Sequence, residues 1–171
     1  MEINDTASGF IIRTIRQDEI AQAVAIEQIC FPPNEACSPS DMEKRIKAAP
    51  DMFLVAEDKS TGKLAGFLNG LSTKETSFRD EFFTDPDLND PEGDTVMLLG
   101  LDVLPEYRRR GLASALMREY AAREKKKGRA RLILTCHSFR IDMYRKMGYE
   151  SCGVSASVWG GEEWFDMILT L

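Results

Sequence analysis

LDVLPEYRRRGLASAL, residues 101–116, joins an apolar segment to a helical pattern through a turn with three consecutive arginines. The apolar run ends at a proline, and Arg108, Arg109 and Arg110 then stand directly before Gly111. A helix start has unpaired N–H groups and a partial positive charge, so it attracts anions. Because glycine adds no side chain between a ligand and the backbone, the stretch predicts a phosphate-binding turn between a strand and a helix.

Two widespread phosphate-binding motifs are absent from this turn. No GKS or GKT follows the glycine, and no GxGxxG is present, which excludes the nucleotide-kinase loop and the dinucleotide fingerprint. Three adjacent cations repel one another in water, and a phosphorylated ligand offsets that repulsion through charge-assisted hydrogen bonds. The alternative interpretation is a solvated basic turn that only caps the helix.

The composition is that of an ordinary globular chain. With 171 residues and 43% apolar content, the chain suits one domain over residues 1–171. The net charge of −6 argues against a nucleic-acid partner. No apolar run approaches the ~20 residues of a membrane span, and residues 1–10 lack an apolar signal core. We therefore expect a cytoplasmic protein without a membrane partner, and a monomer because no apolar surface stripe is evident.

The cysteines give no sign of a metal site. Cys30, Cys37, Cys136 and Cys152 show no CxxC spacing, and the chain has a single histidine. A structural zinc site is therefore not expected, and we predict reduced thiols and no metal.

Periodicity and turn residues predict a mixed α/β fold with the order β-α-α-β-β-β-α-β-α-β-β. Strands are expected at 9–15, on either side of a turn at 61–62 within 52–71, at 95–104 and at 130–136, and a closing hairpin at 149–171 turns at Gly160 and Gly161. Helices are expected from Asp18 to 30, at 40–49 with a Ser40–Glu43 capping box, from 112 to 128, and at 139–148. The segment 84–94 is expected to be a solvated acidic loop.

Further features place the arginine turn in a family pattern. Gly100 interrupts the apolar strand, and MYRKMGY (143–149) follows one strand later. Together with the motif Arg108-x-x-Gly111-x-Ala113, these two features resemble the GCN5-related N-acetyltransferase (GNAT) family. The signature of that family is Arg/Gln-x-x-Gly-x-Gly/Ala. The resemblance runs from FIIRTI (10–15) to FDMILTL (165–171). It implies a single acetyltransferase domain with a central mixed sheet of about seven strands, flanked by about four helices.

The resemblance implies acetyl-CoA as the ligand. Its diphosphate would lie at the arginine turn and the helix start, and its pantetheine arm would pair with the strand backbone. The residues implied are Arg108, Arg109, Arg110, Gly111, Leu112, Ala113 and Ser114 for the diphosphate, and Leu101, Asp102 and Val103 for the arm.

Several segments look like arylalkylamine (serotonin) N-acetyltransferases of the non-vertebrate type. They are 25–39, 62–70, 132–149 and 163–171. This likeness implies acetyl transfer to a small arylalkylamine such as serotonin, tryptamine or phenylethylamine, by direct attack in a ternary complex. Two alternatives remain open: acetylation of another amine, such as a polyamine or a protein lysine, and a non-catalytic acyl-CoA-binding module.

Tyr144 is the candidate acid for the departing thiolate. It matches the tyrosine of the family pattern Phe-Tyr-x-x-x-x-Phe, and it would also border the cofactor. A phenol with a pKa of ~10 can protonate a thiolate of similar basicity. The alternative is that Tyr144 only packs its helix on the sheet.

The candidate base is less well defined, because Met97 and Leu99 occupy the positions of two histidines in the vertebrate relatives. Glu35 is the first choice, since its loop resembles one in insect relatives where a glutamate acts through water. Glu27 is the second, because it falls inside the apolar face of the first helix. A water chain without a dedicated base also stays open, and His137 is expected to be a structural or wall residue.

The amine pocket should combine apolar walls with some negative potential. The candidate lining residues are Phe31, Pro32, Cys37, Leu101 and Thr135. Trp159 and Trp164 could also line it, but large aromatic residues in a closing hairpin are more often core residues. Cys136 and His137 are adjacent on a strand and so point to opposite faces, which argues against a nucleophile–base pair.

Overall fold

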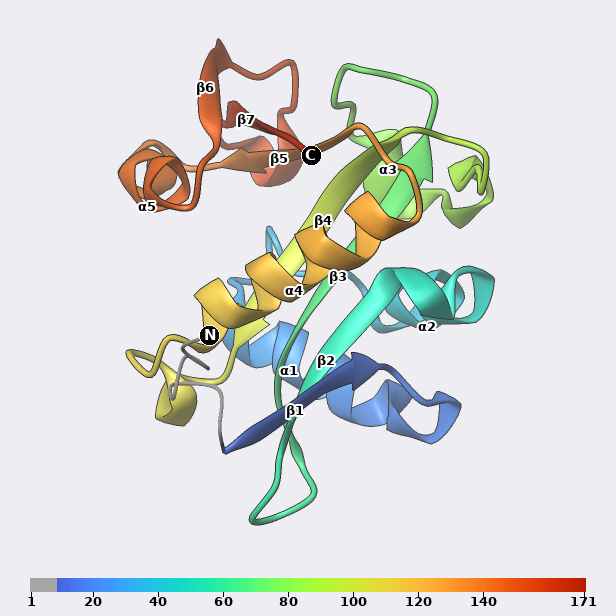
Figure 1. The fold of residues 1–171 in the computed structure, drawn as a ribbon, viewed down its shortest axis with the longest axis vertical. Coiled ribbons are helices and arrows are strands. Elements are labelled where there is room, and N and C mark those ends of the chain that lie inside the picture. Colours follow the sequence, from blue (N-terminus) through green and yellow to red (C-terminus); the bar gives the residue numbers. More distant parts are fainter. Residues whose placement is uncertain (1–8) are drawn as a thin grey trace.

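A computed structural model describes residues 9–171 of the chain; the first eight, most of the segment expected to lack a signal core, lie outside the described residues. Figure 1 shows one twisted sheet, with strand order β1-β2-β3-β4-β5-β7-β6. Among the strands of the described residues, only β4 and β5 are parallel neighbours. The expected mixed seven-stranded sheet is confirmed. The strands are β1 (Phe10–Thr14), β2 (Phe53–Asp58), β3 (Leu64–Thr73), β4 (Thr95–Val103), β5 (Arg131–Cys136), β6 (Glu150–Val154) and β7 (Phe165–Thr170).

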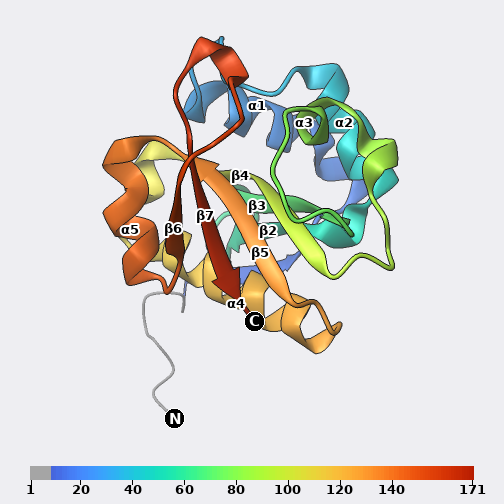
Figure 2. The same ribbon diagram turned by 90° about the horizontal axis from the view of Figure 1, so that it is seen from above.

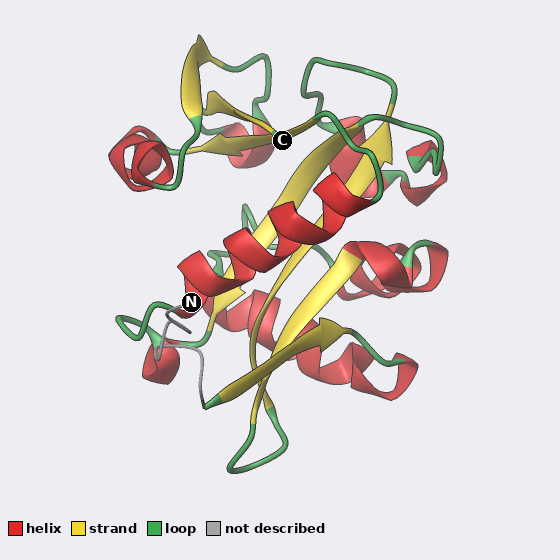
Figure 3. Cartoon of the chain, viewed as in Figure 1, coloured by secondary structure: helices red, strands yellow, loops and turns green. Residues whose placement is uncertain are grey.

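Within residues 9–171, five α-helices cover the two faces of this sheet. They are α1 (Ile20–Cys30), α2 (Pro39–Ala48), α3 (Glu81–Thr84), α4 (Leu112–Lys126) and α5 (Ile141–Lys146). Figure 2 shows α1, α2 and α3 on one face and α4 on the other, and Figure 3 shows the loops that connect them. The helix α3 was not expected, because a four-residue helix is too short to show a periodic pattern. Its one fully buried side chain is Phe82.

The start of α2 differs from the prediction by two residues. Ser38, not Ser40, caps the helix, and its hydroxyl oxygen accepts the N–H of Asp41 at 3.1 Å. Pro39 occupies the first helical position, where its missing N–H costs nothing. The predicted Ser40–Glu43 capping box is therefore wrong.

The start of α1 also differs, because a 3₁₀ turn precedes it. Residues Gln17–Glu19 form this turn, and Asp18 does not cap the helix. Instead the Glu19 carboxylate accepts the backbone N–H of Arg16 at 2.9 Å and forms an ion pair with Arg13. The carboxylate of Glu19 thus fixes the 3₁₀ turn, and no side chain caps α1 itself.

The closing strands are not joined by a tight hairpin. β6 and β7 are connected by residues 155–164, in which Gly160 and Gly161 have φ values of 66° and 75°. A Cβ atom on Gly160 would lie 2.6 Å from the backbone oxygen of Asn34, so this connection docks on the loop after α1. The two glycines do form a turn, but this turn packs against the loop after α1 and does not close a hairpin.

The gap that matters for function opens between β4 and β5. Their parallel pairing covers only Thr95–Met97 against Arg131–Ile133. Beyond this point β4 stays on β3 and β5 stays on β7, so the two strands diverge (Figure 1). Leu99 has no partner residue on β3 and forms a bulge beside Gly100. A glycine that interrupts an apolar strand, as Gly100 does, often marks such a bulge.

Among the described residues, no helix is long and apolar enough to cross a bilayer. Within residues 9–171, no three His, Cys, Asp or Glu side chains come together as a metal site.

Candidate active site

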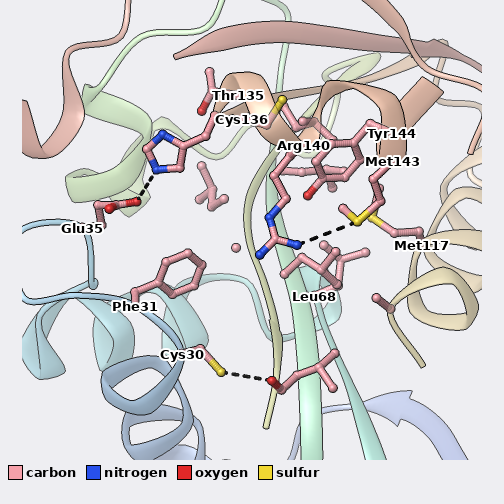
Figure 4. Close-up of a pocket in the computed structure, with 18 of the residues that line it drawn as sticks. Cys30, Phe31, Glu35, Leu68, Met117, Thr135, Cys136, Arg140, Met143 and Tyr144 are labelled. Carbon is pink, nitrogen blue, oxygen red and sulfur yellow. Dashed lines mark hydrogen bonds and ion pairs between the residues drawn. The ribbon is translucent and has the colours of Figure 1, made fainter. Parts of the chain in front are cut away.

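A cavity of about 570 Å³ fills the gap between β4 and β5. Its lining joins α4 and α5 on one side to α1, its following loop and the 155–164 connection on the other. Figure 4 shows Tyr144 and Met143 facing Glu35 and Phe31 across this space. The cavity is therefore two-sided, and each side has its own chemistry.

The first side begins with a row of free backbone amides. Arg109 and Gly111 have φ values of 60° and 74°, and the left-handed Gly111 caps α4. The N–H groups of residues 109–114 donate to no acceptor within residues 9–171. Six successive free amides at a helix start form an anion-binding concavity. The turn therefore fits a diphosphate, as the sequence predicts.

The three arginines do not act alike. Arg108 and Arg109 line the cavity, and the Nε of Arg108 donates to the carbonyl of Val103 at 2.9 Å. Arg110 instead lies over the rings of Phe10 and Tyr107, with its guanidinium carbon 5.1 and 5.7 Å from their centroids. Cation–π contacts hold the side chain of Arg110 outside the cavity, so only its backbone amide belongs to the predicted phosphate-binding turn.

The strand edge next to this turn is partly free. Leu101 and Val103 line the cavity, where β4 has lost its β5 partner. The side chain of Asp102 does not line it and is 1% exposed. The carbonyl of Val103 already accepts Arg108 and also Cys30, whose Sγ lies 3.4 Å away. A ligand that pairs with this strand would have to displace those bonds at Val103.

Tyr144 supplies the acidic group on this side. It is 9% exposed, its ring points into the cavity, and its hydroxyl hydrogen-bonds to no group within residues 9–171 (Figure 4). Burial raises the pKa of Tyr144 to about 12, so the phenol keeps its proton throughout the physiological range. A free, protonated hydroxyl in the gap fits the predicted role as proton donor.

The second side carries a carboxylate–imidazole pair. The Oε1 of Glu35 lies 2.9 Å from the Nε2 of His137. The imidazole stacks on Trp164 with ring centroids 4.2 Å apart, and the indole N–H of Trp159 donates to the Glu35 carbonyl at 2.8 Å. His137 is a wall residue, as expected, but it also pairs with the first-choice base.

Two sequence expectations for this side need correction. Trp159 and Trp164 line the cavity and are not only core residues. Pro32 does not line it, whereas the other predicted amine-pocket residues do, namely Phe31, Cys37, Leu101 and Thr135. The tryptophans were misplaced because their positions depend on how the 155–164 connection folds against the loop after α1.

Glu27 reaches the cavity from α1. It is 6% exposed, as its place on the apolar helix face predicts. Its Oε2 accepts the N–H of Cys37 at 2.9 Å, and its Oε1 has no partner within residues 9–171. Behind it, burial and the neighbouring Glu27 raise the pKa of Asp102 well above its usual range.

The raised pKa of Asp102 predicts how stability depends on pH. Its contribution is fully present below the ordinary Asp pKa and is lost as pH rises toward the higher folded value. We expect the free energy of unfolding to fall less between pH 5 and 8 in Asp102→Asn than in the wild type, measured by urea unfolding. Equal decreases in both proteins would show that Asp102 is ionised throughout this range.

Comparisons with known proteins agree with this geometry. Residues 20–149 match the model of the acetyltransferase (GNAT) family. An acetyltransferase of Photorhabdus laumondii is 27% identical over 143 residues, which cover 81% of this chain and 85% of the relative.

Two solved structures have the same fold. A GNAT-like decarboxylase in complex with isobutyryl-CoA aligns with a TM-score of 0.76 at 18% identity, over 94% of this chain and 98% of the other. A phosphinothricin acetyltransferase from Sinorhizobium meliloti, in complex with acetyl-CoA, aligns with a TM-score of 0.69 at 18% identity. The alignment covers 95% of this chain and 89% of the other. With the family match over most of its length, the chain belongs to the GNAT acetyltransferase family.

Proposed function

We propose that this acetyltransferase moves an acetyl group from acetyl-CoA to the primary amine of a small arylalkylamine, by direct attack in a ternary complex. The observation that carries the proposal is the two-sided cavity: free amides and Tyr144 face an aromatic wall that contains carboxylates.

The acceptor side suits a cation with an aromatic body. Phe31, Phe83, Trp159 and Trp164 supply flat apolar surface, and Phe83 packs on Trp159 with ring centroids 4.6 Å apart. Glu27 and Glu35 add negative charge to the same wall. Apolar walls with a few convergent polar groups are typical of small-molecule sites.

Acetyl-CoA, when bound, supplies the activated thioester. The amides of residues 109–114 and the side chains of Arg108 and Arg109 would hold its diphosphate. The free edge of β4 at Leu101 would align the pantetheine arm with the gap. Because the aromatic wall lines the same cavity as the arginine turn and Tyr144, an acceptor on that wall can reach the thioester.

Proton transfer is divided between the two sides. An arylalkylammonium group must lose a proton before its nitrogen can attack, and we assign that proton to the Glu35–His137 pair. Tyr144 donates its proton at the sulfur atom where the C–S bond breaks. After the C–N bond forms, the nitrogen loses its second proton, and this proton restores the phenol of Tyr144. The first proton leaves the Glu35–His137 pair for solvent.

A substrate panel tests the proposal. Acetyl-CoA consumption is measured with tryptamine, serotonin, phenylethylamine, spermidine and a lysine peptide. We expect turnover with the aromatic amines and little with the others. A preference for spermidine or the lysine peptide would contradict the acceptor assignment, and tight CoA binding without turnover would favour a binding module.

The Glu35–His137 pair predicts a pH-dependent defect. We expect Glu35→Gln and His137→Asn each to lower kcat/KM for tryptamine about 100-fold at neutral pH. The loss should shrink at high pH, where free amine is abundant. Glu162→Gln is a matched control, since Glu162 lies on the neighbouring 155–164 connection but does not line the cavity. A loss that stays constant with pH would assign the pair a structural role.

A further inference from the structure

Three buried carboxyl oxygens beside the cavity have no partner within residues 9–171. They are the Oε1 of Glu27 and both oxygens of Asp102, on side chains that are 6% and 1% exposed. A Cβ atom placed on Gly100 would lie 3.7 Å from the Glu27 Oε1 and 3.3 Å from the Asp102 Oδ1. Both carboxyl groups therefore border the β4 bulge at Gly100, and a hydrogen bond between them is among the causes that raise the pKa of Asp102. When both are ionised, neither has a partner for these oxygens, and unpaired buried carboxyl oxygens are costly.

The surrounding groups do not neutralise this pair. Arg45 is the buried cation on this side, but it donates to the Oδ1 of Asn69 at 3.1 Å and to the Phe83 carbonyl at 2.8 Å. The thiols of Cys30 and Cys37 also face the pair, and burial raises the pKa of both. One arginine thus stands against two carboxyl groups, so charge balance requires one further positive charge.

We propose that Glu27 and Asp102 form a proton-sharing pair that recognises the acceptor's ammonium group, whose charge replaces the shared proton. This inference rests on the proposed function and names the contact that selects amines. Glu27 lines the cavity, so its Oε1 is the contact atom. Asp102 does not line it and is a positioning residue that sets the proton affinity of the pair.

The free and the amine-bound protein differ by one proton on the Glu27–Asp102 pair. In the free protein one O–H bond on the pair holds the proton, consistent with the raised pKa of Asp102. When the ammonium group binds at Glu27, that O–H bond breaks, the proton leaves to the buffer, and both groups are ionised, with Glu27 against the cation and Asp102 behind it. A neutral analogue brings no charge to replace the proton, so the pair discriminates against it.

Titration calorimetry tests this exchange directly. Tryptamine is titrated into CoA-saturated protein at neutral pH, in two buffers that differ in ionisation enthalpy. We expect release of about one proton per amine bound. Tryptophol, the alcohol with the same ring system, should bind without proton release. Asp102→Asn should still bind tryptamine but release almost no proton, and Glu27→Gln should bind tryptamine at least tenfold more weakly with tryptophol affinity unchanged.

The matched control is Asp166→Asn on β7. Asp166 also has a carboxyl oxygen without a partner, but it does not line the cavity. This variant should behave like the wild type. A proton lost by the amine itself would be released equally in Asp102→Asn, so that variant separates the two sources of the proton.

A second measurement needs no variant. Infrared difference spectra of the wild type should show a protonated carboxyl band that disappears when tryptamine binds. Tryptamine binding without proton release, or an unchanged carboxyl band, would overturn the inference. If tryptamine is still acetylated in that case, the proposed function stands. If no amine binds or reacts, both fail.

Discussion

Tyr144→Phe is expected to lower kcat about 100-fold or more while the affinity for CoA stays within twofold of the wild type. The variant keeps the buried ring and removes only the hydroxyl, which makes no hydrogen bond within residues 9–171. Without that proton, the thiolate departs unprotonated from a buried site. Steady-state kinetics with tryptamine and titration calorimetry with CoA measure the two effects.

Tyr149→Phe is the matched control for this prediction. Tyr149 is also buried, its ring lies 5.9 Å from that of Tyr144, and its hydroxyl is unpartnered within the described residues. It does not line the cavity, so its kcat should match the wild type. Equal losses in the two variants would indicate a packing effect, and an unchanged kcat in Tyr144→Phe would remove Tyr144 from the mechanism.

The pKa of Tyr144 adds a pH dependence to this prediction. An acid must be protonated to act, and the phenol keeps its proton up to about pH 12. The wild type should therefore keep gaining activity from pH 7 to about 10, as free amine increases. A fall in kcat in that interval would contradict the assignment.

Gly111→Val is expected to weaken CoA binding at least 100-fold, or about 2.7 kcal/mol. Gly111 has a φ of 74°, a region that β-branched residues enter at a cost of about 1–3 kcal/mol. Its new side chain would also stand among the free amides of residues 109–114. Both effects act where the diphosphate is expected to lie.

Gly128→Val separates backbone strain from ligand contact. Gly128 has a φ of 88°, and a Cβ atom there would meet nothing within 4 Å. Both variants should lower Tm, but only Gly111→Val should lose CoA binding. Full CoA affinity in Gly111→Val would show that the amides of this turn do not hold the ligand.

The sequence predicts the central strands well because β3 and β4 are long, largely apolar runs next to clear turn residues. The segment 95–104 is almost continuously apolar and forms β4, and the arginine turn with Gly111 begins α4. The strand and the helix start depend on residues that are close together in the chain, so sequence patterns predict them. The capping of α2 was misplaced by two residues because Ser38 and Ser40 flank the same proline, and only the structure shows which one accepts the Asp41 amide.

Residues on both sides of the site were predicted, but only the phosphate side was predicted as a unit. Its phosphate side lies on one continuous stretch, 101–114, so the sequence pattern contains it. The acceptor side joins loops that are distant in the chain: Glu35 and His137 are separated by 102 residues. Nothing local indicates that contact, or the burial of Asp102 behind Glu27, because both depend on tertiary packing.

The central claim is that the free amides at the start of α4 hold the diphosphate of coenzyme A. Titration calorimetry of the wild type with CoA and with pantetheine, which lacks the diphosphate, tests it most directly. We predict clear binding of CoA, with a Kd on the order of micromolar, and at least 100-fold weaker binding of pantetheine. Equal affinities for the two ligands, or no heat from CoA, would contradict it.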